Sequence, residues 1–263
     1  MSTLTYAARD STTMLRRNLR RMLRYPSMTL MLVGIPVILM LLFVYVFGGT
    51  MGAGLGGISG GRAEYANYIT PGILLITVGG AAQGTAISVA MDMTEGIIAR
   101  FRTMAIFRPS VLTGHVLGSM IQTILSLAFV VGVALLVGFR PTANPVEWLA
   151  AVGILAAITF AVVWFSVACG LVSKSVETAS NLPMPLMLLP FLGSGFVPTD
   201  SMPAAVRWFA DYQPFTPVME TLRGLLLGTG IGNSAWLAIA WSVAITLASY
   251  VWAKKLYNRD PSH

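Results

Sequence analysis

The sequence predicts an all-α, polytopic membrane protein with six transmembrane helices, a cytoplasmic amphipathic helix at the N-terminus and short re-entrant helices between spans five and six. Its 263 residues have a mean hydropathy of +0.75. Only 10% of them carry a charge, whereas roughly 25% do in soluble domains. Long apolar stretches recur along the chain, each bounded by charge, glycine or proline. These observations argue against a soluble enzyme, a disordered chain and a nucleic-acid-binding module.

The first element is the segment from Ser11 to Arg24, for which the residue pattern predicts a helix with two faces. At 100° per residue, apolar side chains gather on one side and arginines on the opposite arc. The apolar side consists of Leu15, Leu19, Met22 and Leu23, and the basic arc of Arg16, Arg17, Arg20, Arg21 and Arg24. Such a helix beside a span should lie in the cytoplasmic headgroup layer. Two interpretations stay open: a positively charged flank alone, or a helix that also contacts a partner.

The transmembrane spans follow. A bilayer core of roughly 30 Å requires about 20 mostly apolar helical residues. Six stretches meet this length: Ser27–Gly48, Ala66–Ala90, Val111–Phe139, Val146–Val172, Thr178–Val197 and Ser234–Ala253. The fifth contains Pro183, Pro185 and Pro190, so we expect it to be kinked, with part of its backbone unsatisfied. The chain is thereby divided into an amphipathic segment (1–26), a transmembrane domain (27–253) and a cytoplasmic tail (254–263).

The distribution of basic residues orients these spans. Thirteen of the 17 Lys and Arg residues fall in the N-terminal segment, in the loops after spans two and four, and in the tail. The other four, on the opposite side, are Arg62, Arg140, Arg207 and Arg223. The positive-inside rule then places both termini in the cytoplasm, with the chain in the inner (plasma) membrane.

The cytoplasmic loop between spans two and three, from Met91 to Pro109, mixes acidic, basic and apolar residues. A loop that only joined two spans could be far shorter. Apolar anchors surrounded by arginine and glutamate are typical of protein–protein contacts. The loop is therefore predicted to be a docking surface rather than a passive connection.

The outer segment between spans five and six is divided by prolines at positions 198, 203, 214 and 217 into pieces too short to cross a membrane. Trp208 and Tyr212 suit the membrane–water interface. The apolar stretch that follows carries Glu220 and Arg223. Short helices that dip into the outer leaflet are the expected structure.

The spans offer few residues for chemistry. Acidic and basic residues occur only near their ends, whereas ion-coupled transporters and intramembrane enzymes normally place such residues within the helix bundle. His115 and Cys169 are interpreted as packing residues, and a histidine-based metal site is not expected. No lysine follows a G-x-x-x-x-G pattern, so the chain is not expected to bind and hydrolyse ATP by itself.

Two further expectations concern the packing of the spans. Glycine pairs four residues apart allow close helix approach, and they occur as Gly80/Gly84, Gly114/Gly118 and Gly228/Gly232. Spans two and five are expected to line any pathway, because span two carries polar residues and span five is broken by proline. The residues assigned to this path are Gln83, Thr85, Asn181 and Phe191.

Several short motifs, in this order, resemble those of the type-2 ABC exporter permeases, in particular the daunorubicin/doxorubicin-resistance branch. The motifs of the loop and of the approach to span five are Glu95-Gly96, the run Arg100-Phe101-Arg102-Thr103-Met104, Lys174 to Thr178 and Asn181-Leu182-Pro183. Those near span six are Phe196-Val197-Pro198, Met202-Pro203, Gln213-Pro214 and Arg223. The resemblance covers essentially the whole chain. One departure is Ala105, which stands where the family usually has a proline, so the bend of the loop is expected to be shifted.

The resemblance implies a half-transporter: two copies of this chain with two copies of a separate ATP-binding subunit, which would hold the ATP and Mg while this chain binds no cofactor. The residues implied in coupling to that subunit are Glu95, Gly96, Arg100, Phe101, Arg102, Arg16 and Arg20. Those implied in an outer gate are Pro198, Pro203, Pro214, Glu220 and Arg223. The first hypothesis is therefore ATP-driven export of a hydrophobic or amphipathic substrate, a drug-like molecule or a lipid, by a transport subunit in contact with membrane lipid.

Three alternatives stay open. The chain could export a polysaccharide or lipid-linked glycan, for which more aromatic residues would be expected along the path. It could also be a membrane scaffold without transport of its own. An intramembrane enzyme is the least favoured, because no cluster of titratable residues supports it.

Overall fold

The computed structural model describes residues 3–24, 26–56, 61–97 and 109–257, which are helical with short connections and contain no strand. The first half contains α1 (Thr3–Arg24), α2 (Pro26–Leu42), a π-helical turn (Phe43–Phe47), α3 (Gly48–Gly56), α4 (Arg62–Thr94) and α6 (Pro109–Val137). The second half contains α7 (Pro145–Val172), α8 (Val176–Asn181), α9 (Met184–Leu188), a 3₁₀ turn (Thr199–Ser201), α10 (Ala204–Tyr212), α11 (Phe215–Leu227) and α12 (Ser234–Tyr257).

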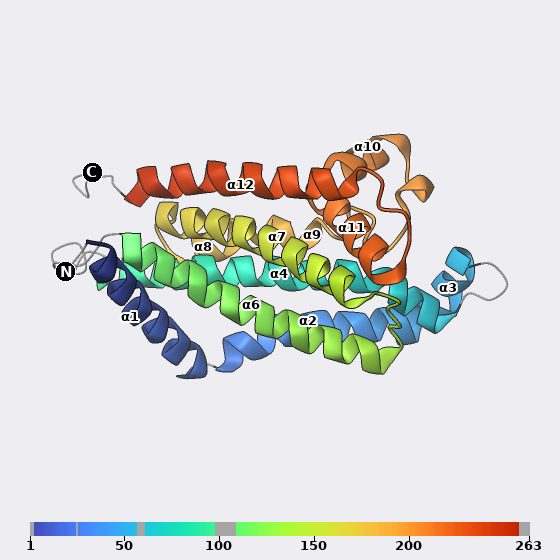
Figure 1. The fold of residues 1–263 in the computed structure, drawn as a ribbon, viewed down its shortest axis with the longest axis horizontal. Helices are drawn as coiled ribbons and strands as arrows, with labels where there is room; N and C mark the ends of the chain where they lie inside the picture. The colour runs from blue at the N-terminus through green and yellow to red at the C-terminus, as the bar shows by residue number, and fades with distance from the viewer. Residues whose placement is uncertain (1–2, 25, 57–60, 98–108, 258–263) are drawn as a thin grey trace.

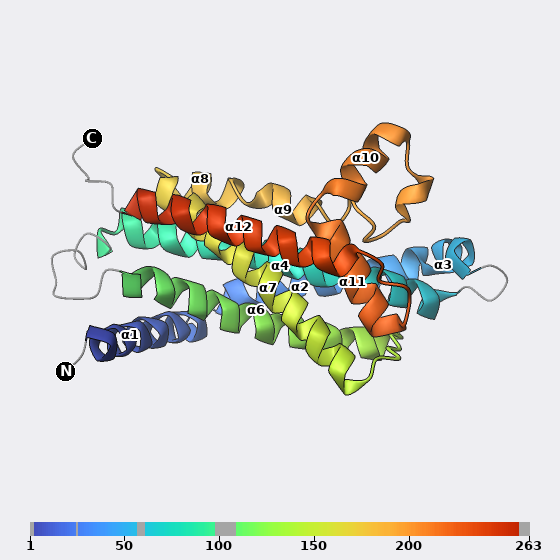
Figure 2. The same ribbon diagram turned by 45° about the horizontal axis from the view of Figure 1, so that its top comes forward.

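The long helices run side by side along the longest axis of the molecule (Figure 1). Both ends of the described chain lie at one end of this bundle, while α3, α10 and α11 lie at the other (Figure 2). α4 occupies the centre, where it packs against α2, α6, α7, α9 and α11. The chain is therefore a multi-pass helical membrane protein with a buried central helix.

Five helices in the described part of the chain are long and apolar enough to cross a membrane. They span Thr29–Ala53, Arg62–Thr94, Ser110–Val137, Pro145–Val172 and Ser234–Tyr257. In the second of these helices, most residues of the apolar stretch are buried inside the protein, whereas in the first and the last helix few of them are. The first and last helices therefore present wide apolar surfaces to lipid or to another chain.

The predicted fifth span, Thr178–Val197, is not a continuous helix, so the count of six spanning helices is not confirmed. It consists of the short helices α8 and α9 followed by turns. Pro183 ends the first of these helices and precedes the second, and Pro190 lies in the turns. A proline lacks the backbone N–H and clashes with the preceding helical turn, which explains both interruptions. We call residues 176–197 the broken segment.

The ends of several helices follow from local sequence. The Asn144 side chain accepts hydrogen bonds from the backbone N–H groups of Val146 and Glu147, each at 2.9 Å. The Glu147 carboxylate accepts one from the Asn144 N–H at 2.7 Å, which completes a capping box with Pro145 at the first helical position of α7. α11 ends at Gly228, whose φ of +72° favours glycine. These caps fix where the two helices meet their connecting loops.

Glycines of α4 allow the broken segment to pack directly on this helix. A Cβ atom added at Gly72 would lie 2.9 Å from the backbone of Gly195, and one at Gly79 would lie 3.1 Å from the backbone of Met187. Contacts this short leave no room for a side chain. The broken segment is thus held against α4 by backbone-to-backbone packing at two points.

The predicted glycine pairs have different roles. Gly114 and Gly118 of α6 face Met14 and Asn18 of α1, so this pair allows close helix approach within one chain. The prediction is wrong for Gly228/Gly232, because both residues have positive φ in the connection between α11 and α12. That pair shapes a turn rather than a helix contact.

We predict that Gly72→Ala lowers the apparent melting temperature of the detergent-solubilised protein, since the added methyl group must displace the backbone of Gly195. Overpacking of this kind costs about 1–3 kcal/mol. Gly132→Ala on α6 is the matched control, because nothing lies within 4 Å of its added Cβ. Replacing glycine by alanine inside a helix should there be neutral or stabilising by up to about 1 kcal/mol. Equal melting temperatures for the two variants would contradict the close packing.

Candidate functional site: a cavity beside a buried ionic cluster

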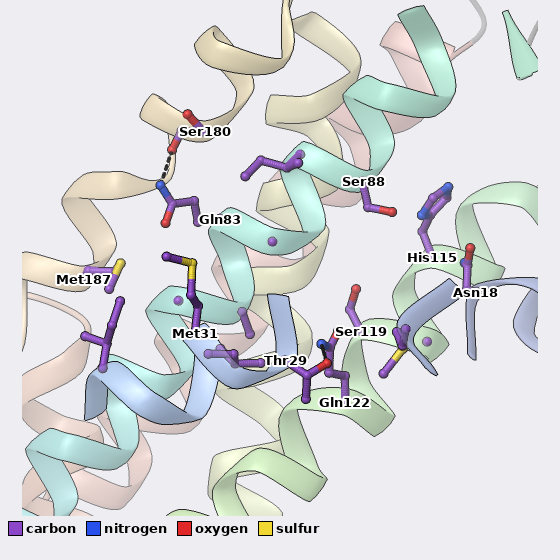
Figure 3. Close-up of a pocket in the computed structure, with 18 of the residues that line it drawn as sticks. Asn18, Thr29, Met31, Gln83, Ser88, His115, Ser119, Gln122, Ser180 and Met187 are labelled. Atoms are coloured by element: carbon purple, nitrogen blue, oxygen red, sulfur yellow. Dashed lines mark hydrogen bonds between the residues drawn. The ribbon is translucent and has the colours of Figure 1, made fainter. Parts of the chain in front are cut away.

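A cavity of about 640 Å³ lies between α1, α2, α4, α6 and the broken segment. Its volume falls in the range of pockets that hold drug-sized ligands. Figure 3 shows polar side chains from several helices around it. The polar lining residues are Asn18, Thr29, Gln83, Ser88, His115, Ser119, Gln122 and Ser180. The apolar ones include Met22, Met31, Leu32, Ile35, Ile76, Ile87, Met91 and Met187.

Hydrogen bonds hold the polar part of the cavity wall in place. The Gln122 amide donates to the Thr29 hydroxyl at 3.0 Å and so links α6 to α2. The Gln83 amide donates to the backbone carbonyl of Ser180 at 3.2 Å and links α4 to the broken segment (Figure 3). Within the part of the chain that the structure describes, no Asp, Glu, Lys or Arg lines the cavity. The cavity therefore offers preorganised amide and hydroxyl groups beside apolar surface.

The structure brings some of the path residues predicted from the sequence to this cavity and not others. Gln83 lines it, and Thr85 lies buried behind it, where its hydroxyl donates to Ser119 at 2.8 Å. Asn181 is exposed and is not part of the lining. Phe191 also lies outside the lining and stacks on Phe196 with ring centres 4.5 Å apart. The broken segment reaches the cavity instead through Ser180 and Met187.

A buried ionic cluster borders the cavity. Asp92 of α4 is only 1% exposed. Its carboxylate forms an ion pair with Arg17 of α1 and lies 3.0 Å from Nε2 of His115 on α6. His115, interpreted from the sequence as a packing residue, is buried at 2% exposure, and it also contacts Asp92 and lines the cavity. Cys169 is buried, as expected for such a residue.

The sequence contained a signal for this cluster. Asp92 stands between Met91 and Met93 in a long apolar helix, and an ionisable residue inside an apolar helix is a functional candidate by default. The sequence-based prediction ended span two at Ala90 and so assigned Asp92 to the cytoplasmic loop from Met91 to Pro109. Its partners lie 75 and 23 positions away in the chain, so no local pattern identified them.

Of the residues predicted to couple to a partner, the structure describes those on α1 and directly after α4. Glu95 is exposed directly after α4, and Gly96 follows with φ +69°. Arg16 and Arg20 are exposed on α1, whereas Arg17 between them turns inward. Arg100, Phe101 and Arg102 lie outside the described residues.

α1 therefore has three faces rather than the two that the sequence predicted. One face packs on the bundle through Met14, Arg17 and Asn18, since the arginine arc is interrupted by the ion pair with Asp92. Leu15 and Leu19 are half-buried beside it. The exposed arginines form the third face.

The opposite end of the molecule is organised around Arg223 of α11, which is 8% exposed. Its guanidinium donates to Glu220 at 2.9 Å, to the Ser194 carbonyl at 2.7 Å and to the Tyr68 carbonyl at 3.3 Å. The Tyr68 ring lies 4.1 Å below the guanidinium carbon, which adds a cation–π contact. Arg223 thereby ties α11, the broken segment and α4 together.

The prolines predicted for this end separate its elements. Pro198 precedes the 3₁₀ turn, Pro203 precedes α10 and Pro214 precedes α11. The short helices expected from this spacing are confirmed. Pro217 was also predicted to divide the segment, but it lies in the first turn of α11, where a proline's missing N–H needs no partner.

The backbone of the broken segment is held by side chains from outside it. Gln83 donates to the Ser180 carbonyl, and Arg223 donates to the Ser194 carbonyl. Gln213 donates to the Leu189 carbonyl at 2.8 Å. The sequence-based analysis noted Gln213 only as part of a motif, because nothing in its local pattern reveals a partner 24 residues away.

Comparison with known proteins adds family information. The ABC-2 type transporter family matches residues 10–227. The chain is 27% identical over 241 residues to the daunorubicin resistance ABC transporter permease protein DrrB1 of Streptomyces coeruleorubidus, covering 91% of this chain and 82% of that protein. It is 22% identical over 192 residues to the probable doxorubicin resistance ABC transporter permease protein DrrC of Mycobacterium tuberculosis, covering 72% of this chain and 70% of that protein.

We predict that Arg223→Gln destabilises the protein by about 2–3 kcal/mol, because it removes charge-assisted hydrogen bonds to buried carbonyl groups. Arg207→Gln is the control, since Arg207 is 48% exposed and pairs with Asp200 and Asp211 at the surface. Surface pairs of this kind contribute about 0–1 kcal/mol. Thermal unfolding in detergent should therefore separate the two variants. Similar losses for both would show that the Arg223 contacts add no stability.

Proposed function

Because the chain belongs to the ABC-2 type transporter family and is the membrane permease subunit of an ABC exporter, we propose that it moves a hydrophobic or amphipathic substrate, a drug-like molecule or a lipid, out of the cytoplasm or inner leaflet. The observation that carries this proposal is the cavity beside α4. Its size suits one drug-sized molecule, and its lining combines apolar side chains with uncharged hydrogen-bonding groups. The curated relatives are named for resistance to daunorubicin and doxorubicin, which fits this substrate class.

The composition of the cavity favours a substrate that varies in shape. Met22, Met31, Met91 and Met187 all line it. Methionine side chains are flexible and polarisable, and surfaces rich in methionine adapt to several ligands. Amides and hydroxyls on the facing walls would bind the polar part of an amphipathic molecule. A fixed charge would select against such a molecule, and the described lining contains none from Asp, Glu, Lys or Arg.

The proposed route leads from the cavity along α4 and the broken segment to the opposite end of the bundle. A segment made of two short helices and turns can change shape more easily than a continuous helix. At the outer end, Glu220 and Arg223 would act as the gate, with Pro198, Pro203 and Pro214 as the points where the short helices turn. Opening would require Arg223 to break its hydrogen bonds to the broken segment and to α4 and to form others in their place. In this proposed topology the broken segment is the fifth of six crossings, and α10 and α11 dip into the outer leaflet.

We propose that energy comes from a separate ATP-binding subunit in two copies, which holds ATP and Mg, and that two copies of this chain pair in the inner (plasma) membrane. α1, which carries the exposed Arg16 and Arg20, lies at the same end of the bundle as both termini (Figure 1). The C-terminal end of α4, which the exposed Glu95 and the turn at Gly96 follow, lies there too. This end would be cytoplasmic, with α1 in the headgroup layer and the loop after α4, including Arg100, Phe101 and Arg102, against the ATPase. The excess of basic residues on this side supports that orientation.

Glycan export is supported less well than export of a hydrophobic molecule. Sugar-binding paths commonly use aromatic side chains, and within the described residues the cavity lining contains no Phe, Tyr or Trp. A scaffold without transport would have no use for a preorganised cavity. Both alternatives are separated from the proposal by a transport assay.

The test fills the cavity without changing its polar groups. Nothing lies within 4 Å of a Cβ added at Gly84, and this residue lines the cavity. We predict that Gly84→Leu lowers daunorubicin efflux by about tenfold in cells that also express the partner ATPase, a loss equivalent to roughly 1.4 kcal/mol of substrate binding.

Gly153→Leu on α7 is the matched control. This exposed glycine also has open space around it but lies outside the cavity, so efflux should stay at the level of the unmodified chain. Equal efflux by the two variants, at equal amounts of protein in the membrane, would refute the assignment of the cavity as the substrate site.

A further inference from the structure

A continuous set of contacts leads from the cavity to α1. His115 lines the cavity and contacts Asp92, and Asp92 pairs with Arg17 of α1. Arg17 also contacts the side chain of Asn18 at 3.5 Å, and Asn18 lines the cavity as well. In Figure 3, His115 and Asn18 stand next to each other at one side of the cavity. The ionic cluster thus borders the cavity on one side and belongs to α1 on the other.

The cluster also lies directly beside the exposed residues that we propose to contact the ATPase, Glu95 after α4 and Arg16 and Arg20 on α1. Asp92 is three residues before Glu95 on the same helix end, and Arg17 is flanked on α1 by the exposed Arg16 and, one turn further, by Arg20. A shift of α1 relative to α4 at this point would move residues on both elements together. Three side chains, those of His115, Asp92 and Arg17, connect the cavity to these two elements.

Physical considerations make this contact strong and sensitive to its members. A buried carboxylate is costly without partners, so Asp92 holds Arg17 and His115 near it. Gly114 and Gly118 of α6 face Met14 and Asn18 of α1, which lets these two helices approach closely. The Arg17–Asp92 ion pair adds a polar restraint on the position of α1 against α4.

Asp92 and Arg17 alone would form an ion pair that only stabilises the fold. His115 adds a connection to the cavity, because it belongs to the cavity lining and its Nε2 contacts the Asp92 carboxylate. A ligand that displaces or bonds this ring changes the partners available to Asp92. Asp92 itself is not part of the cavity lining, so it would act through its neighbours rather than on the ligand.

We infer that His115, Asp92 and Arg17 form a positioning link that transmits occupancy of the cavity to α1 and to the end of α4, and hence to the ATPase. The inference rests on the proposed function, since it presupposes a ligand in the cavity and a partner at the docking surface. Asp92 and Arg17 are positioning residues: they set where α1 lies and do not bind the substrate.

The test uses the permease–ATPase complex reconstituted in liposomes, with daunorubicin as the probe. ATP hydrolysis is measured as a function of probe concentration, which separates the half-maximal concentration from the maximal stimulation. For Asp92→Asn and Arg17→Gln we expect the maximal stimulation of ATP hydrolysis to fall at least about fivefold, while the half-maximal probe concentration stays unchanged. The reason is that the probe still binds in the cavity, but its binding no longer changes the position of α1. Arg17→Lys should restore most of the stimulation, and the double variant should lose no more than Asp92→Asn alone.

Docking and linkage are distinguished by a second variant. Glu95→Arg combined with Arg20→Glu should reduce co-purification of the ATPase, whereas Arg17→Gln should co-purify normally. If Arg17→Gln stimulates like the unmodified chain, the link is refuted while the proposed function stands. If the unmodified chain shows neither stimulation nor efflux, the proposed function itself fails.

A distance measurement keeps the inference testable without the ATPase. Spin labels at Thr13 of α1 and at the exposed Lys174 after α7, in a Cys169→Ala background, report the position of α1. Daunorubicin should change the distance between the two spin labels, and His115→Leu should abolish this change. A distance unaffected by the probe in the chain with His115 intact would overturn the proposed link.

Discussion

The structure depends on how a proline-broken stretch of backbone is satisfied inside an apolar helix bundle. Where water is excluded, each carbonyl group released from a helix needs another donor. Gln83, Gln213 and Arg223 each supply one, from three different elements, to the carbonyl groups of Ser180, Leu189 and Ser194. The positions of α4 and α11 relative to the broken segment follow from these bonds. So does the need for glycine at the two points where α4 and the segment touch.

The cavity is a consequence of the same arrangement. Two short helices and turns replace a full-length helix beside α4, and the small residues Gly80, Ala81 and Gly84 of α4 line the space that remains. A site formed this way has one rigid wall, α4, and one wall whose short pieces can move separately. The contacts of Arg223 with the Tyr68 and Ser194 carbonyl groups and the ion pair of Asp92 with Arg17 then place a fixed point at each end of α4. This arrangement suits a subunit that must respond to force at one end and release substrate at the other.

The sequence predicted the all-α fold class, the places of five long helices and the interruption of the predicted fifth span, because apolar length and proline act locally. It also placed short helices after Pro203 and Pro214 for the same reason. It did not predict every helix boundary: α4 extends four residues beyond the predicted span Ala66–Ala90 at each end.

Sequence prediction failed where the partner is distant in the chain: Asp92 with Arg17, Gln213 with Leu189, and the role of His115. In α1, the wheel pattern could not show that Arg17 leaves the basic arc for a buried carboxylate. Of the path residues, Gln83 was found because it is polar in an apolar helix, whereas Asn181 and Phe191 could not be assigned a direction within a segment that is not a regular helix.

The central claim is that the broken segment and α4 enclose a water-accessible substrate site within one chain. The most direct measurement is labelling of single cysteines at Met187 and Ser88, which face the cavity from the two walls, in a Cys169→Ala chain. Both positions should react with a membrane-impermeant, charged thiol reagent, and daunorubicin should slow that reaction. A cysteine at Leu247, which is 60% exposed on α12, should react only with a lipid-soluble reagent. The account would be contradicted if Met187→Cys and Ser88→Cys behaved like Leu247→Cys and daunorubicin gave no protection.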